Sequence, residues 1–282
     1  MGHTAYSSAT LSSTISDRGY DTKSTREIFT ETSINNAMSP YNMGIRESRD
    51  SKEHPESLAI ILALDVTGSM GSVPHFIVKN GLLNIMDGII GRGVLHPQIL
   101  FSGIGDHECG DHAPLQLGQF ESGDDLLVHW LENLFLEGGG GGNDGESYML
   151  AWYMAAKHTA IDCFEKRNQK GFLFTIGDEP VLPNIPANAL KGIMGEGQFE
   201  NFKSVELLNM AREKYNVFHL HIRNQTSNGQ RMEVMDGWKQ IMGENLLIVE
   251  RQEEVANAIV NIVTANIGQP AAPADDPTEI LL

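Results

Sequence analysis

Cysteines, basic residues and long apolar runs are scarce in this sequence, and each scarcity excludes a class of protein. Two cysteines, Cys109 and Cys163, are too few for a disulfide framework and fit a reducing, cytoplasmic environment. The 20 Lys and Arg residues against 37 Asp and Glu residues give a net charge of −17. Because nucleic-acid affinity rests on clustered basic residues, we expect no nucleic-acid partner. No apolar run approaches the ~20 residues of a membrane span, and the polar N-terminus lacks the apolar segment of a secretory signal.

Composition divides the chain into three parts. Residues 1–56 are polar and rich in Ser and Thr, which predicts an N-terminal arm that is flexible or wraps irregularly around the core. Residues 57–267 carry regular hydrophobic patterns and are expected to form one domain. Residues 268–282 are rich in Pro and Ala and predict a disordered tail.

An apolar run that ends abruptly in polar residues is the most informative stretch. Residues 60–64 are all apolar and predict a strand buried on both faces. Asp65, Thr67 and Ser69 follow at every second position, with Gly68 between the two hydroxyls. A carboxylate and two hydroxyls form a set of hard oxygen ligands, which suits Mg²⁺, Mn²⁺ or Ca²⁺ better than zinc or copper.

Strands and helices then alternate to the end of the domain. Further strands are expected at residues 97–106, 113–121, 171–178, 217–223 and 245–250. Helices are expected at residues 73–91, 124–136, from about 148, and at 187–194, 203–215, 231–242 and 253–267. This alternation predicts an open, doubly wound α/β sheet with helices on both faces. Ligands of such sheets collect at the carboxyl ends of the strands, where Asp65, Asp106 and Asp178 would share one edge.

The spacing of three motifs resembles the von Willebrand factor A domain. Asp65, Thr67 and Ser69 are similar to the Asp-x-Ser/Thr-x-Ser motif that begins the metal-ion-dependent adhesion site of this family. The family's second motif is a Thr or polar substitute in a Gly-rich loop, and its third is an Asp that ends the following strand. The loop GGGGGNDGES at residues 138–147 stands in the second place, and Asp178 stands in the third.

The resemblance implies a mostly parallel six-stranded sheet in the order 3-2-1-4-5-6, with a short antiparallel edge strand. It also implies that the hydroxyls of Thr67 and Ser69 ligate the ion directly, that Asp65 and Asp178 bind partly through water, and that an acidic residue of a partner completes the shell. The loop has no Thr, so Asn143, Asp144 and Glu146 are the candidates for the second motif, with Asn143 and Asp144 preferred. Intracellular members of the family are often adaptors for AAA+ ATPases of the MoxR kind, which implies a non-enzymatic protein-binding function.

Two other functions stay open at this point. The segment from Asp106 to His112 holds two Asp, one Glu, two His and one Cys, so a metal-assisted hydrolase with His107 or His112 as base is one alternative. A structural or assembly subunit that reaches a neighbour with its N-terminal arm is the other. His219 and His221 alternate along a strand, which favours a packed face over a ligand pair.

Overall fold

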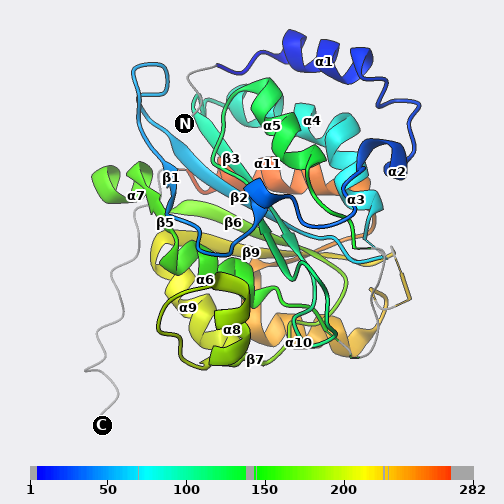
Figure 1. Cartoon of the computed structure of the whole chain (residues 1–282). Coiled ribbons are helices and arrows are strands. Elements are labelled where there is room, and N and C mark those ends of the chain that lie inside the picture. Colours follow the sequence, from blue (N-terminus) through cyan, green and yellow to red (C-terminus); the bar gives the residue numbers. More distant parts are fainter. Residues whose placement is uncertain are drawn as a thin grey trace.

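In the computed structural model, a six-stranded sheet lies between two layers of helices (Figure 1). The structure describes residues 5–68, 70–137, 143, 145–224, 226–227 and 229–267. The strands are β2 (Leu58–Asp65), β3 (Pro97–Ile104), β4 (Leu115–Leu117), β6 (Gly171–Gly177), β9 (Tyr215–Ile222) and β10 (Leu246–Val249). Their order, β10-β9-β6-β2-β3-β4, is the predicted one, and only β4 runs antiparallel to its neighbour. The predicted fold class is therefore confirmed.

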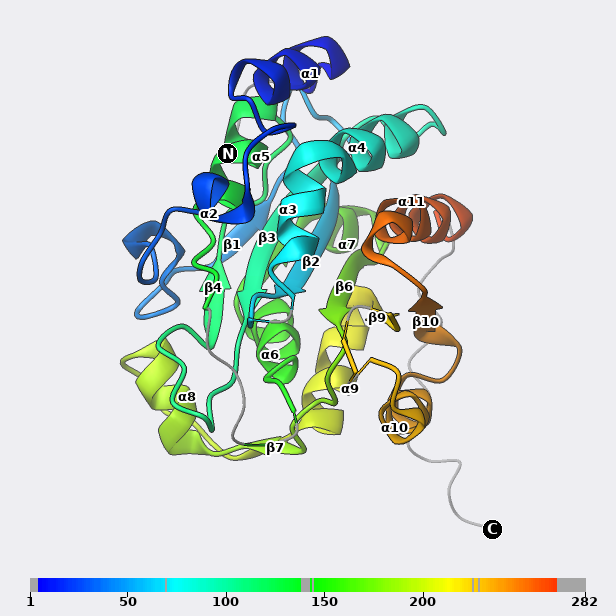
Figure 2. The same cartoon turned by 90° about the vertical axis from the view of Figure 1, so that its right-hand side faces the viewer.

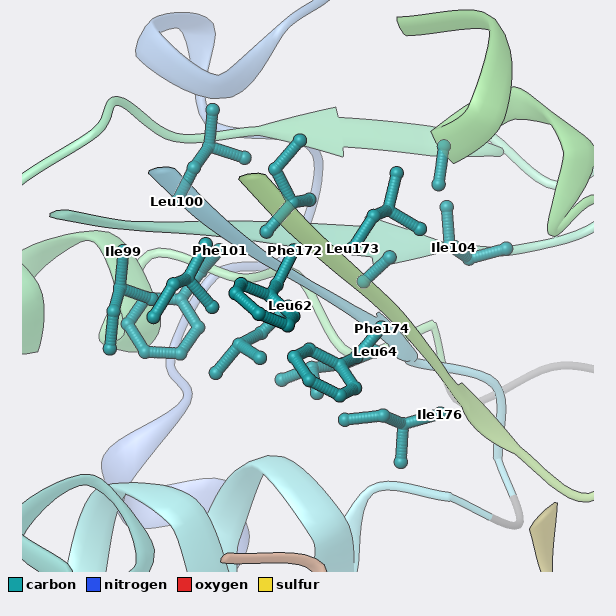
Figure 3. Packing of buried hydrophobic residues seen from close by; sticks show 14 of the residues in the cluster. Leu62, Leu64, Ile99, Leu100, Phe101, Ile104, Phe172, Leu173, Phe174 and Ile176 are labelled. Carbon is teal, nitrogen blue, oxygen red and sulfur yellow. The ribbon is translucent and has the colours of Figure 1, made fainter. Parts of the chain in front are cut away.

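Strand β2 lies at the centre of the sheet because it is apolar on both faces. It pairs in parallel with β3 and β6, and Leu62 lies in register with Phe101 and Phe174. Every residue of β2 is buried. The side chains of Leu62, Phe101 and Phe174 point to the face covered by the helical segment at residues 72–90, while Leu100 and Leu173 point to the opposite face (Figure 3). Packing of β2 in the sheet core thus fixes the position of Asp65 at the carboxyl end of this strand.

Helices cover both faces of the sheet (Figure 2). They are α1 (Ser8–Asp17), α2 (Thr25–Ile28), α3 (Ser72–Phe76), α4 (Leu82–Ile90), α5 (Asp124–Glu132), α6 (Met149–Lys157), α7 (Asp162–Arg167), α8 (Ala187–Met194), α9 (Ser204–Lys214), α10 (Met232–Met242) and α11 (Val255–Ala265). Helices α4 and α11 pack together on one face, and α6 and α9 pack together on the other. Gly88 permits the first contact, since a Cβ there would come within 2.7 Å of Val260. None of the helices among the described residues is long and apolar enough to cross a membrane.

The helix expected at residues 73–91 is interrupted in the structure. A π-helical turn, Ile77–Gly81, joins α3 to α4 without a break in the chain direction. The apolar spacing of this segment indicates a helix but does not distinguish a π turn from an α turn. Such turns add one residue to the repeat and are common near functional sites. Here the turn lies on the helix that begins directly after the motif of Asp65 and Thr67.

Residues 5–56 wrap around the domain and contribute to its core. Leu11 of α1, Tyr20 and Met38 are buried in the same hydrophobic cluster as the sheet. Helix α1 packs against α4 and α5, and the backbone N–H of Ser7 donates to Asp124 at the start of α5. Further on, β1 (Arg46–Ser48) pairs in parallel with β5 (Thr159–Ile161). Residues 5–56 are thus packed against the domain in the structure. The tail predicted at residues 268–282 lies outside the described residues.

A buried phenol contributes to holding α1 against the domain. The hydroxyl of Tyr20 donates to Glu132 at the end of α5, and the guanidinium of Arg18 contacts both groups. We expect Tyr20→Phe to lower the free energy of unfolding by about 1–2 kcal/mol, because the mutation leaves a half-buried carboxylate with one donor fewer. Urea denaturation measures the change. The exposed Tyr41 is the control, and Tyr41→Phe should leave stability within about 0.5 kcal/mol of the wild type.

A pair of hydrogen bonds at Asn42, called the Asn42 clamp below, joins the arm to the end of α8. Asn42, with a left-handed φ of 55°, donates its backbone N–H to the carbonyl of Met194 at 2.8 Å. Its side-chain oxygen accepts the N–H of Glu196 at 2.7 Å. Gly195 has a φ of 91°, and a Cβ there would lie 2.2 Å from the Asn42 side chain. Two short antiparallel strands, β7 (Asn184–Ile185) and β8 (Phe202–Lys203), pair on either side of α8. The hydrogen bonds of Asn42 hold the arm beside the end of this helix.

Candidate metal centre

Asp65 is fully buried at the end of β2, and three donors converge on its carboxylate. Oxygen Oδ1 accepts the backbone N–H of Thr67 at 3.0 Å and the Thr67 hydroxyl at 2.6 Å. Oxygen Oδ2 accepts the hydroxyl of Tyr148 at 2.8 Å. Because the Thr67 hydroxyl donates its only hydrogen to Asp65, its oxygen lone pairs remain available to a cation. This is the arrangement expected of a directly ligating hydroxyl held by a carboxylate.

Tyr148 fits against Asp65 only because residue 177 is glycine. A Cβ at Gly177 would lie 1.8 Å from the Tyr148 hydroxyl oxygen and 3.0 Å from Oδ2 of Asp65. Tyr148 itself is fully buried and has edge-to-face ring contacts with His219 and Trp238. The backbone at the end of β6 therefore comes close to the Asp65 carboxylate, and the phenol of Tyr148 occupies the space that a side chain at residue 177 would fill.

Asp178 follows β6 directly and is also fully buried. Its Oδ2 accepts the hydroxyl of Thr226, from the segment that follows β9, whereas Oδ1 has no hydrogen-bond partner within the described part of the chain. Burial raises the pKa of this carboxyl group. A buried oxygen without a donor is costly, and an ion at this position would offset that cost.

Of the three candidates in the glycine loop, the structure describes Asn143 and Glu146. The side-chain amide of Asn143 donates to Glu108 at 3.2 Å, and Asp144, like Ser69, lies outside the described residues. Glu146 is 6% exposed, and its Oε2 has no hydrogen-bond partner among the described residues. Its backbone is fixed to the segment after Asp178 by bonds to Pro180 (2.9 Å) and Leu182 (3.0 Å). Among the described loop residues, Glu146 is thus the one with an unsatisfied buried carboxylate oxygen.

Burial and mutual repulsion raise the pKa values of the acids at this edge of the sheet. The pKa of Asp65 is raised to about 7, first by burial, while hydrogen bonds from Thr67 act against the shift and the charge of Asp178 adds to it. The pKa of Glu146 is raised to about 10 by burial and then by the charges of Asp65 and Asp106. Perturbed carboxyl pKa values of this kind cluster at functional sites, and a bound cation would favour the ionised forms.

The donor set fits a hard divalent cation. Among the described residues, no three His, Cys, Asp or Glu side chains form a metal cage by themselves. The site would therefore depend on hydroxyl oxygens in addition to carboxylates, with Thr67 in place and Ser69 outside the described residues. Such an all-oxygen set is typical of Mg²⁺, which takes one or two carboxylates and keeps several waters.

The cluster at residues 106–112 builds a loop beside this centre. Oδ2 of Asp111 accepts the N–H of Asp106 at 2.8 Å, and Oδ1 of Asp106 accepts the N–H of Glu108 at 2.7 Å. The ring of His107 lies 2.7 Å from the hydroxyl of Ser147, next to Glu146. These side chains hold the loop backbone and position its neighbours.

The pair of strand histidines is packed inside the protein. His219 stacks on Trp238 with ring centroids 3.5 Å apart, and His221 contacts the carbonyl of Gly229 at 2.8 Å. Both rings are fully buried, which is the packed face that the sequence predicts. Sequence reasoning missed Tyr148 and Thr226, because neither lies in the Asp-x-Thr-x-Ser motif and only their hydrogen bonds show their role.

Comparison with known proteins gives a likeness of fold. No protein-family model and no curated protein matches the sequence. Among solved structures, the pilus adhesin SpaC from Lactobacillus rhamnosus GG is similar, with 10% identity, a TM-score of 0.47, and coverage of 79% of this chain and 30% of that chain. The proximal thread matrix protein 1 of the mussel byssus has 10% identity, a TM-score of 0.44 and coverage of 74% and 48%.

A third similar structure is a von Willebrand factor type A protein from Catenulispora acidiphila. Its identity is 9% and its TM-score is 0.42, with coverage of 76% of this chain and 43% of that chain. One structural neighbour is thus a von Willebrand factor A domain. This chain spans less than half the length of each of these three structures. Identities of 9–10% assign no function to any residue of this chain.

Proposed function

We propose that this chain is a divalent-cation-dependent protein-binding module. The observation that carries the proposal is the buried pair of Asp65 and Thr67, in which the carboxylate holds the hydroxyl in a ligating orientation at the end of the central strand. The unsatisfied oxygens of Asp178 and Glu146 add further candidate oxygen ligands at the same edge of the sheet. Mg²⁺ is the ion we propose, with Mn²⁺ and Ca²⁺ as alternatives of the same ligand preference.

Thr67 and Ser69 would hold the ion directly in this proposal, with Asp65 and Asp178 behind them. A loop residue, Asn143, Asp144 or Glu146, would complete the protein's contribution, and the burial of Glu146 favours it over Asn143. The bound ion would supply a positive charge that an acidic residue of a partner can complete. A AAA+ ATPase of the MoxR kind is the first partner to test. We place the module in the cytoplasm, because both of its cysteines are free thiols.

Binding is favoured over catalysis by the state of the nearest candidate base. One ring nitrogen of His107 contacts Ser147, and the other is buried without a hydrogen-bond partner. Burial also lowers the pKa of this ring. A general base must reach the proton that it abstracts, directly or through one water. The second ring nitrogen of His107 is buried, although the residue lines a cavity, which argues against the hydrolase alternative in which it is the base.

Thermal unfolding with added ions tests the cation site. At a Mg²⁺ concentration 100 times the Kd, the wild type should gain about 2.7 kcal/mol of stability, and EDTA should remove the gain. Asp65→Ala and the milder Thr67→Val should both lose the response, whereas Asp236→Ala, at an exposed position on α10, should keep it. A wild type that does not respond to Mg²⁺, Mn²⁺ or Ca²⁺ would contradict the proposal.

Calorimetric titration of the partner tests the second half of the proposal. When this protein is titrated into a MoxR-type ATPase in the calorimeter, heat of binding is expected in buffer with Mg²⁺. The heat is expected to vanish in buffer with EDTA. Equal affinity in both buffers would support a protein-binding function but contradict the proposal that the ion takes part in binding.

A further inference from the structure

A cavity of about 390 Å³ lies beside the candidate metal centre, within the size range of ligand-binding pockets. Its three walls come from distant parts of the sequence: the turn of the arm at residues 34–41, the loop at residues 107–115 that follows β3, and helix α8. The arm therefore creates a recess that the sheet and its helices would not form alone.

The walls of this cavity are fixed by hydrogen bonds before any ligand arrives. The Asn42 clamp joins the arm to the end of α8. Opposite, the carboxylate of Glu137 accepts the N–H of His112 at 2.7 Å and that of Ala113 at 3.3 Å, which anchors the loop from beneath. A preformed pocket loses little entropy when it binds, so its shape can select a ligand.

The lining combines aliphatic side chains with polar ones, among them Asp111 and the two histidines His107 and His112. Ile34, Pro40, Leu115 and Ile193 supply aliphatic walls, and the ring of Tyr41 is 58% exposed at the rim. Asp111 is the one acidic residue of the lining, and among the described lining residues none is Lys or Arg.

A second carboxylate lies behind the loop wall. Beneath the loop, the buried carboxylate of Glu137 is held by backbone N–H groups. Burial lowers the pKa of His107, which favours the neutral form of its imidazole. A recess with aliphatic walls, a carboxylate in its lining and no Lys or Arg among its described lining residues complements a ligand that is apolar and positively charged.

We propose that this cavity is a docking pocket for a partner segment in which apolar side chains flank a lysine or an arginine. The apolar side chain would fill the space against Ile34 and Ile193, and the cation would pair with Asp111. This docking is independent of the divalent ion, because it uses none of the residues assigned to the metal centre. The two proposals can therefore fail separately.

Three acetylated and amidated tripeptides, Leu-Lys-Leu, Leu-Met-Leu and Leu-Glu-Leu, test the pocket in buffer with EDTA. The readout is the change of ¹H–¹⁵N NMR shifts in full-length ¹⁵N-labelled protein. Saturable shifts confined to the three walls are expected for Leu-Lys-Leu, with a Kd about tenfold lower than for Leu-Met-Leu. Equal affinity for Leu-Lys-Leu and Leu-Glu-Leu, or no saturable binding of Leu-Lys-Leu, would overturn the proposal.

Two variants separate filling of the pocket from loss of its charge. A Cβ at Gly192 of α8 would meet no atom within 4 Å, so Gly192→Phe can fill the recess without a clash and should abolish the shifts. Gly237 of α10 also has open space around it, and Gly237→Phe is the matched control that should bind normally. Asp111→Asn keeps an acceptor for Asp106 and should bring Leu-Lys-Leu to the affinity of Leu-Met-Leu. Unchanged binding in Gly192→Phe would also overturn the proposal.

Discussion

Gly177→Ala is expected to lower the free energy of unfolding by about 3 kcal/mol, the upper range for added methyl groups in a packed core. The new Cβ would lie 1.8 Å from the Tyr148 hydroxyl oxygen, so one of the two must move. Tyr148 cannot swing aside, because the ring is fully buried between His219 and Trp238 and its hydroxyl is bonded to Asp65. Urea denaturation at constant pH, with comparison of the m-values, measures the loss.

A double mutant separates the clash from other effects of the alanine. Tyr148→Phe removes the hydroxyl but leaves the ring carbon that bore it, which would still lie 2.7 Å from the new Cβ. The pair should therefore be less destabilised than the sum of the single variants, with partial rescue only. Gly192→Ala is the control, since its Cβ meets open space on a helix, and it should be neutral or stabilising by up to about 1 kcal/mol. Full additivity of the two site mutations would contradict the proposed contact.

In EDTA, the protein is expected to lose roughly 6 kcal/mol of unfolding free energy between pH 5 and pH 8 because of its buried acids Asp65 and Glu146. The native pKa of Asp65 is about 7 and that of Glu146 is about 10, whereas the same groups in an unfolded chain titrate near pH 4. Above pH 4 the native state therefore holds protons that the unfolded state has released. Stability from these groups is present at low pH and is lost as the pH rises towards the native pKa values.

Mg²⁺ should reverse this pH dependence. An ion at the centre favours the ionised carboxylates, so unfolding free energies measured with saturating Mg²⁺ should no longer fall between pH 5 and pH 8. In EDTA, the double variant Asp65→Asn with Glu146→Gln should flatten the slope, since neither side chain titrates. The comparison is a series of urea denaturations at each pH. An identical slope in the wild type and the double variant would show that other groups cause it.

The sheet could be predicted because buried parallel strands leave a strong local signal, whereas its strand order followed from the resemblance to the von Willebrand factor A domain. The apolar run before Asp65 and the Gly-Asp ending at Asp178 are visible in the sequence, and parallel pairing places both acids at one edge. The conformation of residues 77–81 could not be predicted, because α and π turns share the same apolar spacing. Wrapping of residues 5–56 was open as well, since a few buried side chains such as Leu11 and Met38 fix a segment that is otherwise polar.

The candidate site was less predictable than the fold. Asp65 and Thr67 form the hydrogen-bonded pair that their alternation suggests, but the role of Tyr148 depends on a missing side chain at Gly177, which no local pattern reveals. Glu146 was one of three alternatives in the loop, and burial distinguishes it from Asn143. The residue types in the glycine-rich loop indicate candidate metal-ligating side chains, whereas the path of the backbone decides which of these side chains faces the site.

The wrapped arm has a consequence for the order in which this protein folds. Ser7 contacts Asp124, 117 residues later, Arg18 contacts Glu132, 114 residues later, and Arg49 contacts Asp162, 113 residues later. Contacts over such separations close large loops and form slowly. During synthesis, residues 5–56 leave the ribosome before α5 and α7 and must wait for these helices before they have a surface to bind. The arm is therefore made before the helices that hold it and finds its place after them.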